Sequence, residues 1–543
     1  MRSQYWFRSN RIHLVPFRGS AAVVASALCF FTIVSVGCSA DETSGQNTKA
    51  DPEKAPGKNS GSAGSNGSGG EGNSGAGTGE NGGTSAGENG EGGEFAGGGG
   101  GKPAKPPTTP GASVTWHEHI APLVAAKCTG CHLDGGIAPF PLGSYQESAK
   151  WSPAMAPATR SRLMPPWAAH NTAECEMPGK FKDDLRLSEA EVGLFEEWNK
   201  QGAPEGDPKN AAPLPAAPAL TIDQPARSLK IPSGVSVAGT QDSFVCFRLD
   251  PDLKSDVWLT GTQIIPGNSR VAHHGLLYLD ENDESAQLVN ADGTYNCFGG
   301  PTVGGAQLIS AWAPGSVPTL LPAKTGMPVK AGSKLVVQMH YHPTGAGVEV
   351  DDATTVQLDF VTQEPDFVAA LYLLGNFDQE NLPFAGGVGF GLATGPEFLI
   401  PAGAEAHVET NRYQLPGGAF ALPLHLWTIA THMHYVGTDM KISVERDAGD
   451  QCLLQTPMWD FNWQRGYYFD GPVTELPQLL PGDILQLRCT YNNSLTNPFV
   501  REALTDQGLK APIDVRLGEA TLDEMCLGVF GLAVPKVFAA ALP

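Results

Sequence analysis

The second half of the chain alternates between short apolar runs and turns. The runs are rich in Val, Leu, Ile, Tyr and Thr, which favour strands, and turns such as "IPAG" and "LPGD" separate them. The clearest runs are "HGLLYLD" at 274–280, "KLVVQMHYH" at 334–342, "LHLWTIATHMHYV" at 424–436 and "DILQLRCTY" at 483–491. No long amphipathic helix pattern interrupts them. The pattern predicts an all-β sandwich or a pair of sandwiches.

Residues 187–208, "LSEAEVGLFEEWNKQGAPEGDP", follow a helical pattern instead. Ser188 is the expected N-cap, and Glu191 stands three residues later, as in a capping box. Leu194 and Trp198 fall on one face, which predicts packing inside the domain that contains this helix, and the helix is expected to end near Gly202.

The N-terminal segment has the pattern of an export signal. Arginines precede the apolar run at 21–36, and "SVGC" then ends at Cys38, so residues 1–38 are expected to direct export. The cysteine after "SVG" resembles a bacterial lipobox, which implies a lipid anchor on Cys38. A plain signal peptide or one short transmembrane helix is the alternative, because Ser35 stands where lipoboxes usually carry Leu. Ser39 implies the outer membrane, so we expect a place in the bacterial cell envelope, periplasmic or surface-exposed.

Residues 39–112 consist mainly of Gly, Ser, Glu, Asn and Thr, with very few apolar side chains. Such a segment cannot bury a core, so we expect a flexible linker between the anchor and the folded domains. The formal net charge of the chain is -22, and no long cluster of Lys and Arg is present. A nucleic-acid partner needs a basic surface and is therefore excluded.

"CTGCH" at 128–132 has the C-x-x-C-H spacing of c-type haem attachment. Cys128 and Cys131 would bond the haem vinyl groups, and His132 would ligate the iron. A redox dithiol or half of a zinc site is the competing interpretation, but no second C-x-x-C is present. For the other axial position we favour Met164, which precedes two prolines that stiffen its loop. The rival ligands are Met155, Met177 and His170.

Residues 115–208 resemble the small c-type cytochrome domains of bacterial multidomain redox proteins. The resemblance lies in "HIAPLVAAKCTGCH", "GGIAPFPLGSY", "RLMPPW" and the closing "W...GAP.GD". It implies a small all-α haem c domain over residues 113–210. His117 and His119, at the start of its first helix, are expected to be solvated rather than to bind iron.

Three close groups of histidines lie in the β region: His273 with His274, His340 with His342, and His432 with His434. Residues i and i+2 of a strand share a face, so the last pair can converge on one metal while Met433 points away. His273 and His274 face opposite sides of a regular strand, so both reach one metal only at a twisted or bulged position.

The residue types near these groups favour copper. Few acidic residues lie beside the histidines, which disfavours Ca²⁺ and Mg²⁺. No thiolate pattern supports structural zinc. Imidazoles together with a thioether suit copper, and a thioether favours Cu(I) in particular.

Four segments, "VAHHGLLYL", "VVQMHYH", "ATHMHYVG" and "LDEMCLG", occur in this order. In this the chain resembles the copper type II, ascorbate-dependent monooxygenases, the family of dopamine β-monooxygenase and peptidylglycine α-hydroxylating monooxygenase. The resemblance implies two tandem jelly-roll-like β-sandwiches, over residues 225–370 and 371–540, with one copper each across a solvent-filled cleft. It implies an electron-transfer copper on His273, His274 and His340. It implies a catalytic copper on the set His432, His434 and Met525.

The same resemblance implies disulfides Cys489–Cys526, beside Met525, and Cys246–Cys297 in the first sandwich. Cys175 and Cys452 are left over and either pair or stay free.

The resemblance implies a monooxygenase that uses O₂ to hydroxylate a C–H bond of a small organic substrate. Electrons would come from ascorbate or another donor, relayed by the haem c domain. Ala430 and Leu527 replace the arginine and asparagine with which peptide-amidating members hold a peptide carboxylate, which argues against a peptide substrate that ends in glycine. The alternative is a non-catalytic copper-binding or electron-transfer surface lipoprotein on the same scaffold. His342 is expected to be a stray ligand or a partner of one, and Trp459, Asn462 and Trp463 to pack the second sandwich or line a substrate surface.

Overall fold

The computed structural model describes most of the chain from residue 113 onward. It covers residues 113–542 except 135, 137, 217–218, 240, 346, 377–397, 416, 418–421, 447–448, 519 and 521. The expected signal at 1–38, the lipidated Cys38 and the linker at 39–112 lie outside the described residues. Among the described helices, none is both long and apolar enough to span a bilayer.

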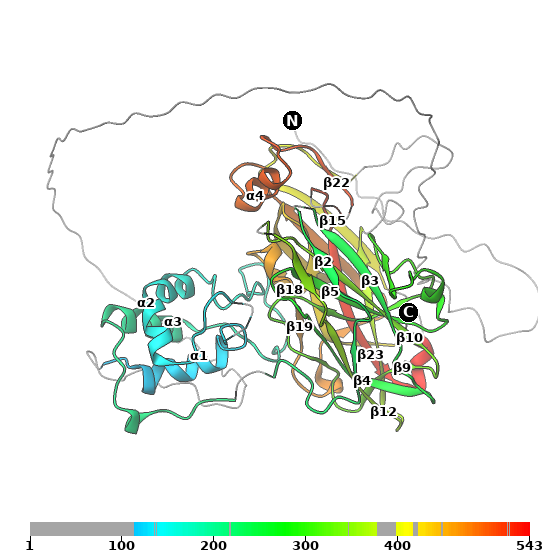
Figure 1. Ribbon diagram of the computed structural model, residues 1–543, viewed down its shortest axis with the longest axis horizontal. Coiled ribbons are helices and arrows are strands. Elements are labelled where there is room, and N and C mark those ends of the chain that lie inside the picture. The colour runs from blue at the N-terminus through cyan, green and yellow to red at the C-terminus, as the bar shows by residue number, and fades with distance from the viewer. Residues whose placement is uncertain are drawn as a thin grey trace, which may run out of the picture. The chain divides into compact units, whose positions relative to one another are not determined.

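The helices of residues 113–210 gather into one small cluster (Figure 1). In chain order they are η1 (Trp116–Ile120), α1 (Ala121–Lys127), α2 (Tyr145–Arg160), α3 (Glu189–Lys200) and η2 (Pro208–Asn210). The capping box predicted for α3 is confirmed: the Ser188 hydroxyl accepts from the Glu191 N–H, and the Glu191 carboxylate accepts from the Ser188 N–H. Leu194 and Trp198 are buried, as the helical pattern predicts.

The expectation that both histidines of η1 are solvated is wrong for His119. Its side chain is buried, and Nδ1 accepts a hydrogen bond of 3.2 Å from the backbone N–H of Thr115. The imidazole thus bonds the backbone at the start of the helix, a contact that the sequence pattern does not reveal.

The remainder is mostly β-sheet in sandwich form, as the sequence predicts. One five-stranded sheet has the order β6 (Thr294–Asn296), β3 (Ser243–Leu249), β10 (Lys334–Tyr341), β5 (Ala272–Asp280), β7 (Gln307–Trp312). The strands that face it are β1 (Arg227–Lys230), β12 (Thr355–Val361), β4 (Val257–Ile265) and β9 (Thr325–Val329), with β8 (Thr319–Leu320) beside β4. Ile264 of β4 packs against Gly275 of β5, which fixes the two layers face to face.

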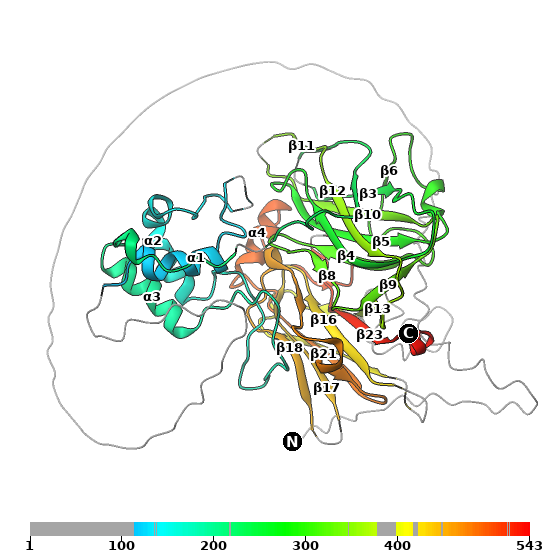
Figure 2. The same ribbon diagram turned by 90° about the horizontal axis from the view of Figure 1, so that it is seen from below.

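A second pair of layers follows (Figure 2). One layer contains β13 (Phe367–Gly375), β23 (Leu527–Pro535), β16 (Leu424–His432), β19 (Gly466–Tyr468) and β20 (Gln478–Leu479). The other has the order β15 (His407–Gln414), β21 (Ile484–Tyr491), β17 (Gly437–Glu445), β18 (Gln451–Thr456). Gly528 of β23 lies against Ile442 and Leu487 of the opposite layer.

The two sandwiches share one sheet, because β13 pairs in parallel with β9 and antiparallel with β23. β13 therefore runs across the expected domain boundary at 370. The smaller elements are β2 (Val235–Val237) with β11 (Glu349–Asp351), β14 (Leu399–Ile400) with β22 (Val515–Arg516), α4 (Pro498–Asp506), and the short helices η3 (Glu284–Gln287), η5 (Phe461–Trp463), η6 (Val473–Glu475) and η7 (Lys536–Ala541).

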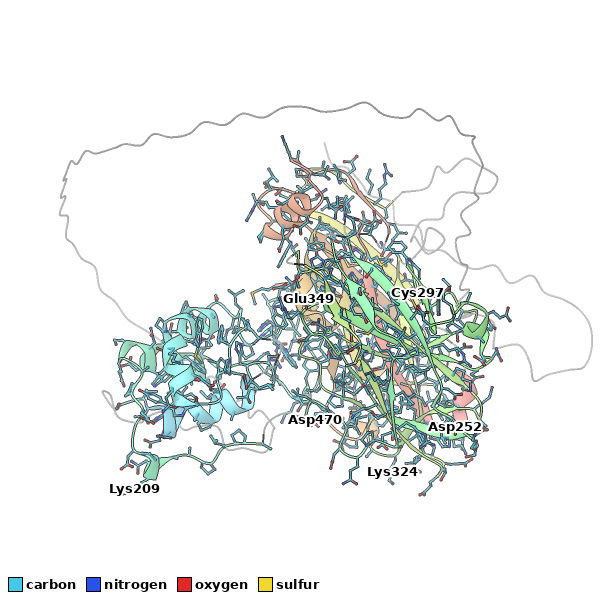
Figure 3. The ribbon with its side chains drawn as sticks, in the orientation of Figure 1. Lys209, Asp252, Cys297, Lys324, Glu349 and Asp470 are labelled. Atoms are coloured by element: carbon cyan, nitrogen blue, oxygen red, sulfur yellow. A yellow bond between two sulfur atoms is a disulfide. The ribbon has the colours of Figure 1, made fainter. Side chains whose placement is uncertain are left out.

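Three disulfides cross-link the described chain. Cys246–Cys297 and Cys489–Cys526 form as expected, with Cα atoms 5.8 and 6.0 Å apart (Cys297 is labelled in Figure 3). Cys175 and Cys452, whose pairing the sequence leaves open, are also bonded. This third bridge joins the segment before α3 to β18.

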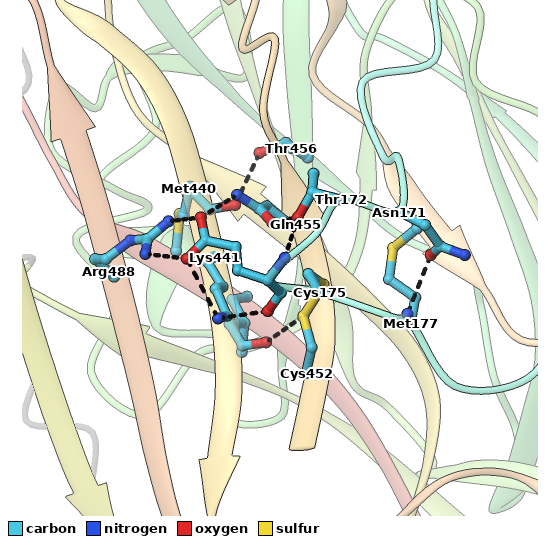
Figure 4. The surroundings of a disulfide bond; sticks show 12 residues. Asn171, Thr172, Cys175, Met177, Met440, Lys441, Cys452, Gln455, Thr456 and Arg488 are labelled. Carbon is cyan, nitrogen blue, oxygen red and sulfur yellow. Dashed lines mark hydrogen bonds and ion pairs between the residues drawn. A yellow bond between two sulfur atoms is a disulfide. The ribbon is translucent and has the colours of Figure 1, made fainter. Parts of the chain in front are cut away.

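Charged groups surround the Cys175–Cys452 bridge (Figure 4). Glu174 pairs with Arg488 at 2.8 Å and with Lys441 at 3.7 Å. Hydrogen bonding from Arg488 is the largest cause that lowers the pKa of Glu174 to about 2, against a smaller opposing effect of burial. The helical part of the chain is thus attached to the second sandwich by a covalent bond and an ionic cluster.

Replacing Cys175 and Cys452 together by serine is expected to lower the free energy of unfolding by about 2–4 kcal/mol, because the bridge closes a very long loop. Denaturant titration followed by tryptophan fluorescence measures this. The matched control is the Glu174→Gln variant, which weakens only exposed ion pairs and should cost about 1 kcal/mol or less. An unchanged midpoint in the double-serine variant would contradict the expectation.

Candidate metal centres and an adjoining cavity

The first histidine group lies on two neighbouring strands of the five-stranded sheet. His273 and His274 stand near the start of β5, and His340 stands near the end of β10, where it is the register partner of His274. The register shifts at this point, since Tyr341 pairs with Ala272 and His273 is left over. The bulge that the adjacent histidines require is therefore present, and it turns both rings toward His340.

The three rings present nitrogen atoms to a common centre. One ligand atom from each lies within 4.8 Å of the others. His274 Nδ1 is 3.2 Å from the Nδ1 atoms of both His273 and His340. An imidazole nitrogen carries either one proton or one in-plane lone pair, so His274 Nδ1 can make only one of these as a normal hydrogen bond. A cation between the three nitrogens would satisfy all of them.

The charge state of this group suits a metal. Burial, followed by repulsion from His340, holds the pKa of His273 and of His274 well below the usual value. Both rings are therefore neutral at pH 7, and neutral imidazole is the form that ligates metals. The residues present thus fit a cation bound by three histidines.

Asp242 lies beside the first histidine group, next to His340 and His342. Its carboxylate lies 3.3 Å from His340 Nε2 and 2.7 Å from His342 Nδ1. Burial opposes ionisation of Asp242, but the hydrogen bonds from His340 and His342 outweigh it and hold its pKa below the usual range. His342 is therefore a partner of the carboxylate that orients His340, and it does not belong to the three-ring group.

The second histidine group lies at the end of β16. The strand ends at His432, one residue before the buried Met433, and His434 follows directly. The rings of His432 and His434 are 5.2 Å apart between centroids. Met433 packs in the hydrophobic core, so the strand geometry predicted from the sequence is confirmed in separating this methionine from the two histidines.

Both rings of the second group are oriented through Nδ1. His432 Nδ1 lies 2.6 Å from Gln464 Oε1, and His434 Nδ1 lies 2.9 Å from the carbonyl oxygen of Asp523. Each Nδ1–H thus donates to an oxygen and leaves Nε2 as a free lone pair, the arrangement typical of metal-binding histidines. Burial, then His432, lowers the pKa of His434 to about 3, so this ring is neutral too.

Strand register places the backbone of Met525 near that of these histidines. His432 pairs with Leu527 in the antiparallel ladder of β16 and β23, so Met525 lies two residues beyond that pair, in line with His434. Glu524 links the two segments, because one oxygen of its buried side chain accepts hydrogen bonds from the backbone N–H groups of both His434 and Met525. Tyr491 adds a hydrogen bond of 3.0 Å to the Met525 carbonyl.

A single aromatic ring lies between the two histidine groups. Phe461 stacks on His273 at 4.6 Å and on Tyr435 at 4.0 Å, and its centroid is 6.3 Å from that of His434. The resemblance noted above implies a solvent-filled cleft between the two sites. At this point the space between His273 and His434 is occupied by Phe461 instead.

The C-x-x-C-H motif opens onto a cavity of about 380 Å³. Cys128 and Cys131 are free thiols in a chain whose other described cysteines are paired. Burial, then the neighbouring Cys131, raises the pKa of Cys128 to about 12, opposite to the lowered pKa of redox-active dithiols. His132 Nδ1 lies 2.9 Å from the Phe140 carbonyl oxygen, which leaves Nε2 available.

The cavity narrows the choice of second axial ligand. Met164 and Met155 are among the described residues that line it, whereas Met177 and His170 are not. Residues of the β region close its other side, notably Gly315, Trp463 and Arg465. Trp463 therefore lines this cavity. The sequence predicts instead that this residue packs the second sandwich or lines a substrate surface. Trp459 is buried and donates to the His434 carbonyl at 3.1 Å.

Several contacts of the sites could not be read from the sequence. Gln464 and Glu524 lie within the conspicuous "WDFNWQ" and "LDEMCLG" segments, so a signal existed for their neighbourhood but not for their roles. Phe461 also lies in "WDFNWQ". Asp242 had no such signal, because it meets the histidines only through the tertiary fold.

No protein-family model matches the chain, and comparison with curated proteins finds no match. Solved structures similar to part of it include the major capsid protein P2 of bacteriophage PM2, at 10% identity over 56% of this chain and 96% of that chain, with a TM-score of 0.22. The infectious bursal disease virus VP2 subviral particle has 10% identity over 60% and 77% of the two chains, with a TM-score of 0.16. Similarity this low carries no argument about function.

Replacing His274 by alanine is expected to weaken metal binding at the first group, probed with copper, by more than about 100-fold, since even partners that only orient a ligand contribute 10–100-fold. Calorimetric titration of the purified protein with a chelated copper salt measures the change. His407→Ala is the matched control, because His407 bonds Glu409 on β15 at 2.6 Å and belongs to neither group. Equal affinity in the two variants would show that the three-ring group is not a metal site.

Proposed function

We propose that this protein is a copper-dependent monooxygenase that hydroxylates a C–H bond of a small organic substrate with O₂. The observation that carries the proposal is that one chain holds two candidate metal sites with different sets of ligands. One group offers three histidines, and the other offers two histidines whose strand is paired with the segment that carries Met525, 91 residues farther along the chain. The resemblance to copper type II monooxygenases assigns the first group to electron transfer and the second to catalysis.

The first copper would be held by His273, His274 and His340. The neutral rings of His273 and His274 and the convergent nitrogens of all three residues suit Cu(I) and Cu(II) alike, and the Asp242 carboxylate lies 3.3 Å from His340 Nε2. This group contains no thioether, which fits a site that exchanges one electron without binding substrate.

The second copper would be held by His432, His434 and Met525. Copper bound here would supply the one-electron chemistry that O₂ activation requires. Gln464 and the Asp523 carbonyl keep both Nδ1 protons away from the metal, while Glu524 keeps Met525 beside His434. A thioether favours the reduced ion, the form that reacts with O₂.

The electron source would be a haem c group on Cys128, Cys131 and His132, with Met164 as the favoured second ligand. The free thiols and the cavity that they share with Met164 support this assignment. Ascorbate or another small donor would reduce the haem or the copper directly. A lipid on Cys38 would hold the enzyme in the cell envelope.

Two residues of the second sandwich argue against one class of substrate. Ala430 and Leu527 stand where peptide-amidating members of the resembling family carry an arginine and an asparagine. Neither side chain can bind a carboxylate, so a peptide ending in glycine is disfavoured.

Replacing Met525 by isoleucine, which is similar in volume but has no sulfur, is expected to reduce substrate-dependent O₂ consumption by at least about 100-fold, as loss of a group that stabilises the transition state would. Copper at the first group should stay bound. Oxygen-electrode assays with ascorbate and a substrate panel, together with metal analysis, measure both effects. A non-catalytic electron-transfer lipoprotein on the same scaffold would instead show no substrate-dependent O₂ consumption in either form.

The haem assignment makes a separate prediction. In the fully loaded protein, reduced haem should be reoxidised by O₂ rapidly only when both coppers and a substrate are present. Stopped-flow absorbance of the reduced haem band checks this, with copper-depleted protein as the control. Reoxidation at the same rate without copper would contradict a relay from haem to copper.

A further inference from the structure

Residues 461–465, here called the connecting segment, touch all three candidate cofactor sites. The segment comprises η5 (Phe461–Trp463) and the two residues after it. Phe461 stacks on His273 of the first group. Gln464 bonds His432 of the second group, and Trp463 and Arg465 line the cavity of the C-x-x-C-H motif. Five consecutive residues thus join sites that are far apart in the sequence.

Arg465, at the cavity end of the connecting segment, is fixed by a hydrogen bond and a cation–π contact. Arg465 Nη2 donates to the Gly315 carbonyl at 3.0 Å, and the guanidinium lies 4.9 Å from the Trp167 ring centroid. Arg465 is also close enough to Cys131 to oppose the raised pKa of that thiol. The positive charge therefore sits at the wall where a haem attached to Cys131 would lie.

The other end of the segment reaches a metal ligand through one hydrogen bond. Gln464 Oε1 accepts from His432 Nδ1 at 2.6 Å, and Gln464 Nε2 donates to the Phe461 carbonyl at 3.1 Å. The second bond fixes the amide so that its oxygen points at His432. From Arg465 in the cavity wall to His432, the path is one peptide bond, one side chain and one short hydrogen bond.

The first histidine group is reached from the cavity only by longer paths. One runs from Trp463 back through Asn462 to Phe461, whose ring meets His273 by stacking alone, at 4.6 Å between centroids. Gly315 lines the cavity, but it is three residues beyond Trp312, which pairs with Gly275, the neighbour of His274. Electron tunnelling falls off steeply with path length and with the number of gaps between bonded atoms. The path from the cavity through Gln464 to the second histidine group is therefore shorter and has fewer gaps than the paths to the first group.

We infer that the connecting segment delivers electrons from the haem directly to the second site, through Gln464 and His432, without passing through the first histidine group. This rests on the proposed function. Each transfer oxidises one Fe(II) haem to Fe(III) and reduces one Cu(II) at His432, His434 and Met525 to Cu(I). No bond forms or breaks, no proton is required, and a small one-electron donor such as ascorbate re-reduces the haem.

The test is anaerobic and does not depend on turnover. Haem-replete, copper-loaded protein is flash-reduced at the haem, and the decay of the reduced haem band is followed while copper is Cu(II). Gln464→Leu, which removes the oxygen acceptor, should slow this decay at least tenfold, and Gln464→Glu, which keeps an oxygen acceptor, should restore it in large part. Asn462→Ala is the matched control, since Asn462 is an exposed member of the same segment. Decay at the wild-type rate in Gln464→Leu with both coppers present would overturn the inference.

A second variant decides the matter if Gln464→Leu loses copper. His434→Ala removes a ligand of the second site and leaves the first group intact, so metal analysis should find one copper. Direct delivery predicts that haem decay in this variant falls to the rate of copper-free protein, whereas delivery through the first group predicts rapid decay. If even the wild-type haem is not oxidised by Cu(II), the proposed haem relay fails, an outcome distinct from failure of the route.

Discussion

The antiparallel register of β16 and β23 is the constraint on which the second site depends. Pairing His432 with Leu527 sets Met525 opposite the histidine pair, and a slip of one residue would turn Met525 to the other face of the sheet. The Cys489–Cys526 bridge and the Glu524 carboxylate hold this register where the ladder ends. Breaking a disulfide of this kind costs about 2–5 kcal/mol, and here the loss would fall on the residue next to Met525, the proposed metal ligand.

The first histidine group depends on a β-bulge instead. A bulge in β5 turns two adjacent histidines to one side, and the neighbouring strand β10 supplies the third. The two groups meet at Phe461, so their separation is set by one aromatic ring packed between two sandwiches. The shared sheet through β9 and β13 makes this arrangement stiff, because both sandwiches are built on one hydrogen-bonded layer.

Local patterns in the sequence predict much of this. The capping box of α3, the strand-rich second half and the bulge at His273 follow from residue periodicity, and two disulfides follow from the resemblance. The Cys175–Cys452 bridge, the burial of His119 and the roles of Asp242, Gln464 and Phe461 could not be predicted. Each of these depends on contacts between segments more than about 30 residues apart or on a local hydrogen bond with no sequence signature, and periodicity reports neither.

The central claim is that Met525 completes a copper site with His432 and His434. X-ray absorption at the copper edge of the reduced, fully loaded protein tests it most directly, because sulfur scatters far more strongly than nitrogen at bonding distance. The account predicts a sulfur contribution that disappears in the Met525→Ile variant while the nitrogen contribution of the first group remains. A reduced spectrum that nitrogen and oxygen ligands alone explain would contradict it.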